Sequence, residues 1–266
     1  MNLLLFSHDP VYAGAAVAAG VNAIIVDWEF RSKERRQAGF NTEINEGTAS
    51  DLRAIRAATP GRIICRINND PATRREELRL ACELGADEVL LPMVRTTAEV
   101  HDCLDALPSG RELSILVETE ESLALARDWD ALPLARVYLG LNDLLIQRGR
   151  GHLFSPLIDG TIEQFRASYH GQLSVAGVTL PGSGHPIPCR LLMAELARLG
   201  CNFGVGRRSF RRDIPLEALR PGVFAIHEEW RKLQHRSDGQ REVDQQAFVS
   251  LVRNLITHAW RPACAC

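Results

Sequence analysis

Eight short apolar runs alternate with stretches of helical period along the chain, and this alternation restricts the fold more than any other feature. The runs are rich in β-branched residues and have the length of buried strands. They lie at 2–7, 23–28, 62–67, 88–94, 114–119, 136–142, 174–180 and 203–207. Amphipathic helices are expected between them, among others at 50–58, 74–84, 97–107, 121–129 and 190–199. Eight strand-and-helix repeats predict an α/β fold of the (β/α)8 TIM barrel type.

The chain of 266 residues, 45% of them hydrophobic, is expected to form a single barrel domain over residues 1–266. Two helical stretches remain after the last strand, at about 217–236 and 241–259. A barrel repeat needs only one helix, so residues 241–259 are predicted to form an extra C-terminal helix. An apolar stripe along this helix predicts oligomerisation through it. The stripe consists of Val243, Phe248, Val249, Leu251, Val252, Leu255 and Ile256.

Glycine follows several predicted helices just before the next strand, at Gly20, Gly85 and Gly200. A glycine in this place suits the left-handed backbone conformation that commonly ends a helix. These positions therefore predict helix ends, and their similarity to one another is structural.

The formal net charge of −2 arises from 31 basic and 33 acidic residues and gives no overall electrostatic footprint. Neither nucleic acid nor a membrane is therefore expected as a partner, and no run approaches the roughly 20 apolar residues of a membrane span. Small molecules and copies of the same chain are the expected partners. The basic run at 31–36 is interpreted as a solvated loop rather than a phosphate site.

The cysteines are odd in number and dispersed, and most lie in apolar stretches where a free thiol behaves as a small hydrophobe. This pattern favours a cytoplasmic location. The cysteines are Cys65, Cys82, Cys103, Cys189, Cys201, Cys264 and Cys266. The last two form a CxC pair at the chain end, which is interpreted as incidental.

Polar residues follow most of the predicted strands, and in a barrel of this type the carboxyl ends of the strands line the active-site mouth. Glu118 and Asp143 end neighbouring runs about one repeat apart, so they are expected to lie side by side. Two carboxylates can hold Mg²⁺ or Mn²⁺ and leave other positions for water and substrate. Arg66 on the third run would face this pair and could bind an anionic carbonyl substrate and stabilise its enolate. The pattern predicts a metal-dependent enzyme acting on a 2-oxo acid.

Several stretches of the chain resemble the metal-dependent class II 2-oxo-acid aldolases, the 4-hydroxy-2-oxoheptanedioate aldolase family, and the related citrate lyase β subunits and malyl-CoA lyases. They are VDWE at 26–29, CRIN at 65–68, GADEVLLPMV at 85–94, LVETEESL at 116–123 and LGLNDL at 139–144. They follow the family's order over roughly residues 2–210. The resemblance implies that Glu118 and Asp143 are metal ligands and that Arg66 holds the pyruvyl oxygen. Asp27 and Glu29 would orient metal-bound water or the catalytic base, and a trimer or hexamer is implied.

The chain departs from the family where the aldolases carry a histidine for proton transfer, since Phe30 stands there. Three alternatives remain for the proton: His8 after the first strand, His185 in the loop at 181–185, or metal-bound water. His185 is preferred because flanking glycines would let it approach the metal. Asn142 is a candidate for positioning water or substrate.

Structural roles compete with the functional ones for several of these residues. Arg66 could be an ion-pair partner, and Asp27 and Glu29 could only form hydrogen bonds in the mouth. Arg207 and Arg208 could neutralise a substrate carboxylate or phosphate, or could pair with a surface acid such as Asp213.

The predicted function is a metal-dependent carbon–carbon lyase that acts through a pyruvate-like enolate. An acyl-CoA lyase of the citrate lyase or malyl-CoA lyase kind is an alternative, for which the basic residues at 31–36 could contact the nucleotide. A catalytically silent barrel that binds a metabolite is a second alternative, which Phe30 makes credible.

Overall fold

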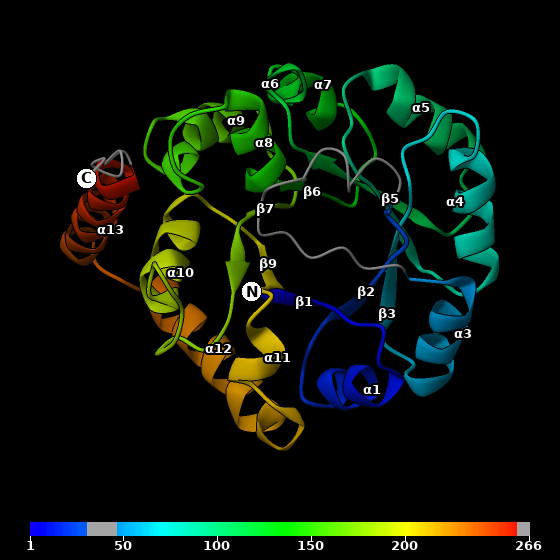
Figure 1. Ribbon diagram of the computed structural model, residues 1–266, viewed down its shortest axis with the longest axis horizontal. Helices are drawn as coiled ribbons and strands as arrows, with labels where there is room; N and C mark the ends of the chain where they lie inside the picture. Colours follow the sequence, from blue (N-terminus) through cyan, green and yellow to red (C-terminus); the bar gives the residue numbers. More distant parts are fainter. Residues whose placement is uncertain (31–46, 260–266) are drawn as a thin grey trace, which may run out of the picture.

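The computed structural model describes residues 1–30 and 47–259, with the backbone alone at 258 and 259. Within this part of the chain, nine parallel strands form one sheet in the order β7-β6-β5-β4-β3-β2-β1-β9-β8. The strands are β1 (Asn2–Phe6), β2 (Ala23–Asp27), β3 (Arg62–Arg66), β4 (Glu88–Leu91), β5 (Glu112–Val117), β6 (Arg136–Leu139), β7 (Leu173–Val175), β8 (Gly177–Val178) and β9 (Phe203–Gly206). Helices surround the strands (Figure 1), so the predicted barrel is confirmed.

The seventh barrel strand is split, which is why nine strands are observed where eight are predicted. Its first part, β7, pairs with β6, and its second part, β8, pairs with β9. Between them Ala176 adopts a left-handed backbone conformation with φ of +62°. This conformation is uncommon for a residue with a side chain and turns the strand, so that each half pairs with a different neighbour.

The helices are α1 (Pro10–Ala18), α3 (Ala49–Ala58), α4 (Arg74–Glu83), α5 (Thr97–Ala106), α6 (Glu120–Leu123), α7 (Ala126–Asp130), α8 (Leu141–Arg148), α9 (Thr161–Ser168), α10 (Cys189–Arg198), α11 (Phe210–Asp213), α12 (Leu219–Gln234) and α13 (Asp238–Ala259). Short 3₁₀ turns lie at η1 (Ser155–Leu157) and η2 (Leu216–Ala218). The predicted helix at 121–129 is in fact two short helices, α6 and α7. The other predicted helices are found within a few residues of their expected ends.

Local sequence signals set several helix ends. Capping boxes begin α3 at Thr48 with Asp51 and α5 at Thr96 with Glu99, where each threonine accepts a backbone N–H and each acid reaches back. The predicted glycine stops are confirmed, because Gly20, Gly85 and Gly200 have φ values of +110°, +104° and +68°.

The buried core has two layers. An inner cluster fills the barrel, and a larger outer cluster lies between the strands and the surrounding helices. The inner cluster consists of Leu4, Ala23, Ile25, Ile64, Leu90, Leu116, Phe203 and Val205. Five of the cysteines are described as free and buried, as predicted: Cys65, Cys82, Cys103, Cys189 and Cys201. Cys264, Cys266 and the basic run at 31–36 lie outside the described residues.

The C-terminal helix α13 packs on α10 of the same chain (Figure 1). Phe248 and Val252 of its apolar stripe are fully buried there, whereas Val243 is 66% exposed. The buried Arg236 helps to fix this arrangement by its ion pair with Asp244 at 2.5 Å. Part of the stripe is therefore covered within the chain, and the prediction of oligomerisation through this helix depends on the part that remains.

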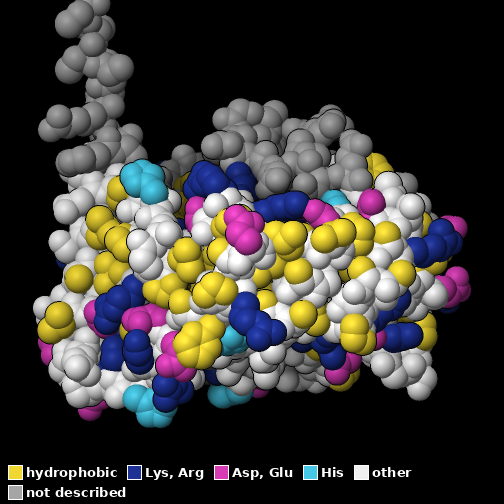
Figure 2. All heavy atoms as spheres, turned by 90° about the horizontal axis from the view of Figure 1, so that it is seen from below, with side chains coloured by type: hydrophobic (Ala, Val, Ile, Leu, Met, Phe, Trp, Pro, Cys, Tyr) yellow, Lys and Arg dark blue, Asp and Glu magenta, His cyan; other side chains and the backbone are white. Residues whose placement is uncertain are grey.

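The surface carries mixed charge. On the face drawn in Figure 2, basic and acidic side chains are interspersed over the described residues, and no broad area of one sign is seen. In the described ranges, no helix has both the length and the apolar composition that a bilayer crossing requires.

Candidate active site

A cavity of about 950 Å³ opens at the carboxyl-terminal ends of the barrel strands and continues into the barrel. Most of the site residues predicted from the sequence line it. They are His8, Asp27, Glu29, Arg66, Glu118, Asn142, Asp143, His185, Arg207 and Arg208. The barrel thus gathers around one cavity residues that are widely separated in sequence, as expected for the mouth of this fold.

Arg66 ends β3 and lies beside Asp27, which ends β2, because the register of the two strands pairs these positions. Its guanidinium donates through Nε to Asp27 Oδ1 at 2.8 Å and through Nη2 to Asp27 Oδ2 at 2.6 Å. Nη1 lies 3.2 Å from Glu29 Oε2. Bidentate pairing of this kind fixes the plane of the guanidinium. These contacts use three of the five N–H groups of Arg66.

Burial alone would lower the pKa of Arg66, but the adjacent carboxylates of Asp27 and Glu29 outweigh this effect and raise it. Arg66 therefore keeps its positive charge in a cavity that shields it from bulk water. Arg66 forms an ion-paired cluster with Asp27 and Glu29, a contact that was not predicted from the sequence. Asp27 and Glu29 orient Arg66 here, while their suggested role toward bound water or a base stays a prediction.

Glu118 directly follows β5, and its carboxylate is held in place by the neighbouring loops. Its Oε2 accepts a hydrogen bond from the backbone N–H of Met93 at 3.1 Å. Met93 has a left-handed φ of +52°, a conformation that is rare for a side chain of this kind and that aims its N–H at the carboxylate. On another side, Gly140 leaves the space that Glu118 occupies, since a Cβ at that position would overlap the Glu118 carboxylate.

Burial is the largest of the effects that raise the pKa of Glu118 to about 8, and the nearby carboxylates of Asp143 and Glu29 add to it. Arg66 and the Met93 N–H oppose this shift only in part. Like charges that cannot all be solvated favour either a proton or a cation between them. A divalent cation would relieve this repulsion.

Asp143 occupies a different place from the one predicted. The strand β6 ends at Leu139, and Asp143 lies in the first turn of α8 rather than at a strand end. There the unpaired N–H groups and the dipole of the helix favour a negative charge. Asp143 is buried and lines the cavity with Glu118, so the predicted pairing of the two carboxylates is supported by their electrostatic coupling.

The carboxylates of Glu118 and Asp143 fit a hard cation that prefers oxygen ligands. Among the described residues, no group of three or more His, Cys, Asp or Glu side chains has the geometry of a metal site. With Glu118 and Asp143 as its side-chain ligands, a cation would take water and substrate at its other positions. Mg²⁺ commonly binds in this way.

The histidine candidates differ in their surroundings. His8 Nε2 accepts a hydrogen bond from the backbone N–H of Asp27 at 3.0 Å, so this nitrogen serves to position the second strand's end. His185 is exposed in the loop before α10 and also lines the cavity. Asn142 is exposed in the first turn of α8 and also lines the cavity.

Residues 207–212, named here the arginine segment, follow β9 and carry four arginines that all line the cavity. Arg207 donates to the carbonyl oxygens of Gly177 and Ile187 at 2.8 and 3.3 Å. Asp213, which sequence suggested as a partner of Arg207 or Arg208, pairs instead with Arg212 at 3.3 Å. The sequence does not predict that Arg211 and Arg212 line the cavity; they lie in α11, directly after Arg207 and Arg208 in the run RRSFRR.

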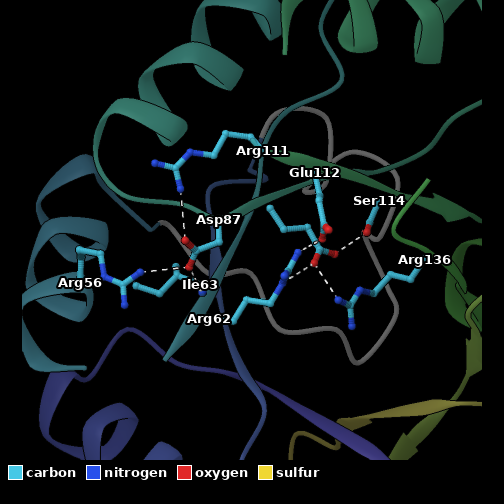
Figure 3. A network of polar contacts seen from close by, with 9 residues as sticks. Arg56, Arg62, Ile63, Asp87, Arg111, Glu112, Ser114 and Arg136 are labelled. Atoms are coloured by element: carbon cyan, nitrogen blue, oxygen red, sulfur yellow. Dashed lines mark hydrogen bonds and ion pairs between the residues drawn. The ribbon is translucent and has the colours of Figure 1, made fainter. Parts of the chain in front are cut away.

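A second group of charges lies at the opposite, amino-terminal end of the barrel (Figure 3). The first residue of β4, Glu88, is fully buried and contacts Arg62 at 2.9 Å, Arg136 at 2.8 Å and the Ser114 hydroxyl. The cavity extends down to Glu88 and Arg136. This network was not predicted from the sequence, because each of its members only begins or flanks an apolar run.

No family profile and no curated protein matches the chain. Solved structures match it over most of its length at low identity. A citrate lyase from Burkholderia xenovorans LB400 is 16% identical, with 98% of this chain and 94% of that chain covered and a TM-score of 0.57. The citrate synthase SbnG is 15% identical, with 85% and 93% covered and a TM-score of 0.58.

A third similar structure is the 3-hexulose-6-phosphate synthase from Salmonella typhimurium, which is 16% identical, with 88% of this chain and 100% of that chain covered and a TM-score of 0.61. Likeness at this level of identity establishes the barrel fold and leaves the chemistry to the residues of the site.

Proposed function

We propose that the protein is a divalent-metal-dependent carbon–carbon lyase of the class II 2-oxo-acid aldolase kind. The observation that carries the proposal is the Glu118 carboxylate. It is buried beside Asp143 and Glu29 in an open cavity, and its pKa is raised to about 8, chiefly by burial. Strongly perturbed groups of this kind in a cleft are candidates for function. The resemblance of the sequence to the class II aldolases agrees with this reading.

The ligands of Mg²⁺ or Mn²⁺ would be Glu118 and Asp143. When bound, the cation would polarise the carboxylate and 2-oxo oxygens of the substrate. Arg66, held in orientation by Asp27 and Glu29, donates its remaining N–H groups to the 2-oxo oxygen. A planar, permanently charged donor suits this task because negative charge grows on that oxygen as the reaction proceeds.

In the cleavage direction, the bond between the substrate's third and fourth carbons breaks, and its electron pair moves into the pyruvate fragment as an enolate. The hydroxyl proton on the fourth carbon leaves at the same time, and an aldehyde is released. We assign this proton to His185, which lines the cavity, because Phe30 stands in the sequence where the aldolases carry a histidine. Asn142 would contact the substrate from the first turn of α8. His185 then returns this proton to the enolate carbon, which gives pyruvate, so the same histidine serves the proton exchange of pyruvate.

Metal binding is the first test of the proposal. Calorimetric titration of the purified protein with Mn²⁺ should give one site, and Glu118→Gln and Asp143→Asn should each weaken it by about a hundredfold or more. Glu112→Gln is the matched control, since Glu112 is a half-exposed carboxylate at the other end of the barrel. Equal Mn²⁺ affinity in all four proteins would exclude the assigned ligands.

Enolisation is the second test, because it requires no knowledge of the aldehyde. Incubation with pyruvate or oxaloacetate in deuterated water should give Mn²⁺- or Mg²⁺-dependent exchange of the protons beside the 2-oxo group. Wild-type protein that binds the metal but catalyses no exchange with either acid would point to a silent metabolite-binding barrel instead.

A further inference from the structure

The floor of the cavity carries two aromatic side chains, Phe6 and Tyr138, and the proposed reaction uses neither of them. Both are partly buried, pack against the inner cluster of the barrel and line the cavity. The Arg66 guanidinium lies over the Phe6 ring, 5.0 Å from its centroid. The Tyr138 ring packs against Phe203 with the ring centroids 6.2 Å apart. Tyr138 therefore brings a hydroxyl group into a floor that is otherwise built from apolar side chains of the inner cluster.

Tyr138 lies beneath the Glu118 carboxylate, because side chains alternate between the two faces of β6. Gly140 follows two residues later and continues the strand pairing, since its N–H donates to the Val117 carbonyl at 2.9 Å. Tyr138 and Gly140 thus face the barrel interior together, about 7 Å apart along the strand. Glu118 occupies the space next to Gly140, where a Cβ would overlap its carboxylate. Tyr138 is therefore one side-chain position deeper in the barrel than Glu118.

The Tyr138 hydroxyl differs from the other two tyrosine hydroxyls of the chain in its hydrogen bonding. Tyr12 donates to the Ile214 carbonyl at 2.8 Å. Tyr169 donates to the Gln172 carbonyl at 3.3 Å. Within residues 1–30 and 47–259, no group forms a hydrogen bond with the hydroxyl of Tyr138, which faces the cavity. Tyrosine hydroxyls that leave bulk water usually have a partner, so a ligand in the cavity is the natural acceptor.

Two opposite charges act on the Tyr138 hydroxyl. Burial is the largest effect and raises the pKa of Tyr138, the Glu118 carboxylate raises it further, and Arg66 lowers it. The net shift is upward, so the hydroxyl keeps its proton at neutral pH and is available as a donor. Under the proposed function the 2-oxo oxygen of the substrate lies between the cation on Glu118 and the guanidinium of Arg66. The hydroxyl is thus close to the two groups that flank this oxygen.

We propose that Tyr138 is a further catalytic residue, whose hydroxyl donates a hydrogen bond to the 2-oxo oxygen from the floor of the cavity. The bond strengthens as this oxygen becomes the enolate oxygen, because a hydrogen bond to a charged acceptor is stronger than one to a neutral carbonyl. The hydroxyl keeps its proton throughout, and proton transfer stays with His185. This inference rests on the proposed function and adds a second donor beside Arg66.

Oxalate is a suitable probe, because it is a planar dianion with an oxygen where the enolate oxygen of pyruvate forms. In calorimetry with Mn²⁺ present, Tyr138→Phe should weaken oxalate binding about tenfold or more, since a charge-assisted hydrogen bond is lost. The kcat of pyruvate proton exchange should fall about tenfold to a hundredfold. The KM for pyruvate and the affinity for Mn²⁺ should change less than about twofold, because the bond is weak in the ground state.

Tyr169→Phe is the matched control, since it removes the same hydroxyl from a buried tyrosine outside the cavity. It should leave oxalate binding and exchange as in wild type. Tyr138→Phe keeps the ring that packs on Phe203, and unfolding curves of both variants check that the fold is unchanged.

Oxalate affinity and exchange rates like those of wild type in Tyr138→Phe overturn the inference. A change in the pyruvate KM alone also overturns it, because the hydroxyl would then contact the substrate equally in the ground state and the transition state. Equal losses in Tyr138→Phe and Tyr169→Phe would assign the effect to packing. Failure of the proposed lyase is seen without any variant, as wild-type protein that binds Mn²⁺ but neither binds oxalate nor exchanges the protons of pyruvate.

Discussion

Two buried glutamates at opposite ends of the barrel show how the same side chain can serve stability or function. At the amino-terminal end, Glu88 lies between Arg62 and Arg136 and accepts from Ser114, so its charge is fully compensated. At the mouth, Glu118 faces Asp143 and Glu29, and its pKa is raised to about 8 by burial and by these carboxylates.

The difference lies in the neighbours, because both glutamates are almost completely buried, at 0% and 7% exposure. A compensated carboxylate fixes strands in their register, whereas an uncompensated one needs a proton or a cation from outside. The comparison predicts that changes at Glu88 act on stability and that changes at Glu118 act on binding.

Glu88→Gln should have the largest effect of the changes considered. It removes the shared partner of Arg62 and Arg136, and Arg136 already has a buried Nε without a hydrogen-bond partner. Breaking a buried ion pair from one side typically costs about 3–5 kcal/mol of unfolding free energy. Urea unfolding measures this loss. Glu112→Gln is the matched control on the same network, and a cost below about 1 kcal/mol is expected because its side chain is half exposed. Equal costs for the two variants would break the comparison.

The pH dependence of stability should follow from Glu118 in the metal-free protein. Its folded pKa of about 8 lies above the ordinary value of 4.5, so between these values the folded form holds a proton that the unfolded form has released. The unfolding free energy should therefore fall as the pH rises from about 5 to about 8, by a few kcal/mol in total. Thermal unfolding in the presence of a chelator measures the slope. Glu118→Gln should flatten it, and a slope that survives this substitution would assign it to another group.

Arg66→Lys should slow pyruvate proton exchange on the order of a hundredfold or more, because lysine offers a point charge where a planar fork is needed. The ion pairs with Asp27 and Glu29 would survive in part, so the variant should stay folded. Exchange rates and unfolding curves measured on the same preparation separate the two effects. An exchange rate near that of wild type would assign Arg66 a structural role like that of the basic residues around Glu88.

Substitution of His185 should affect the reaction, whereas substitution of His8 should affect the stability of the fold. His185→Ala should slow exchange about tenfold to a hundredfold if His185 transfers the proton. His8→Ala should instead cost about 1 kcal/mol of stability, since it leaves the Asp27 N–H without its acceptor. Each variant is assayed with Mg²⁺ and with Mn²⁺. Full activity in both, with a pH profile that moves with the metal, would remove the histidines as bases.

Val243→Glu should have the smallest effect on the fold. It tests the outer face of α13. Val243 is exposed, so the substitution should change the unfolding free energy by less than about 0.5 kcal/mol. If α13 lies on a neighbouring copy, the charge should reduce the hydrodynamic mass measured by sedimentation. Truncation after Gly239 is a harsher test because it also uncovers the face of α10 that Phe248 and Val252 protect. An unchanged mass in both proteins would count against oligomerisation through this helix.

The strands and most helices could be predicted from the sequence because they depend on local patterns. Apolar runs of strand length, capping threonines and glycine stops act over a few residues. The structure places the seventh strand and Asp143 differently from the prediction, in both cases because of a backbone conformation that the sequence does not reveal. Ala176 splits the seventh strand through a positive φ, and Asp143 belongs to α8 because the chain enters the helix directly after Gly140.

The sequence predicts which residues belong to the site better than it predicts which of them contact one another. The strand ends identified Asp27, Arg66 and Glu118 as mouth residues, because every parallel strand of a barrel ends at the same rim. Their pairing depends on register, which sets Asp27 beside Arg66. The network around Glu88 escaped prediction for the same reason, since strands β3 to β6 must be aligned before its members meet.

The hydrogen bond from the Met93 N–H to the Glu118 carboxylate has a practical consequence. An amide proton that points at a carboxylate senses its charge directly, so the nuclear magnetic resonance signal of this one amide should follow whatever occupies the mouth. It should shift once when Glu118 is titrated and again when a cation or substrate arrives. A single labelled methionine at position 93 therefore provides a reporter that the chain already contains, in a protein with only three methionines to assign.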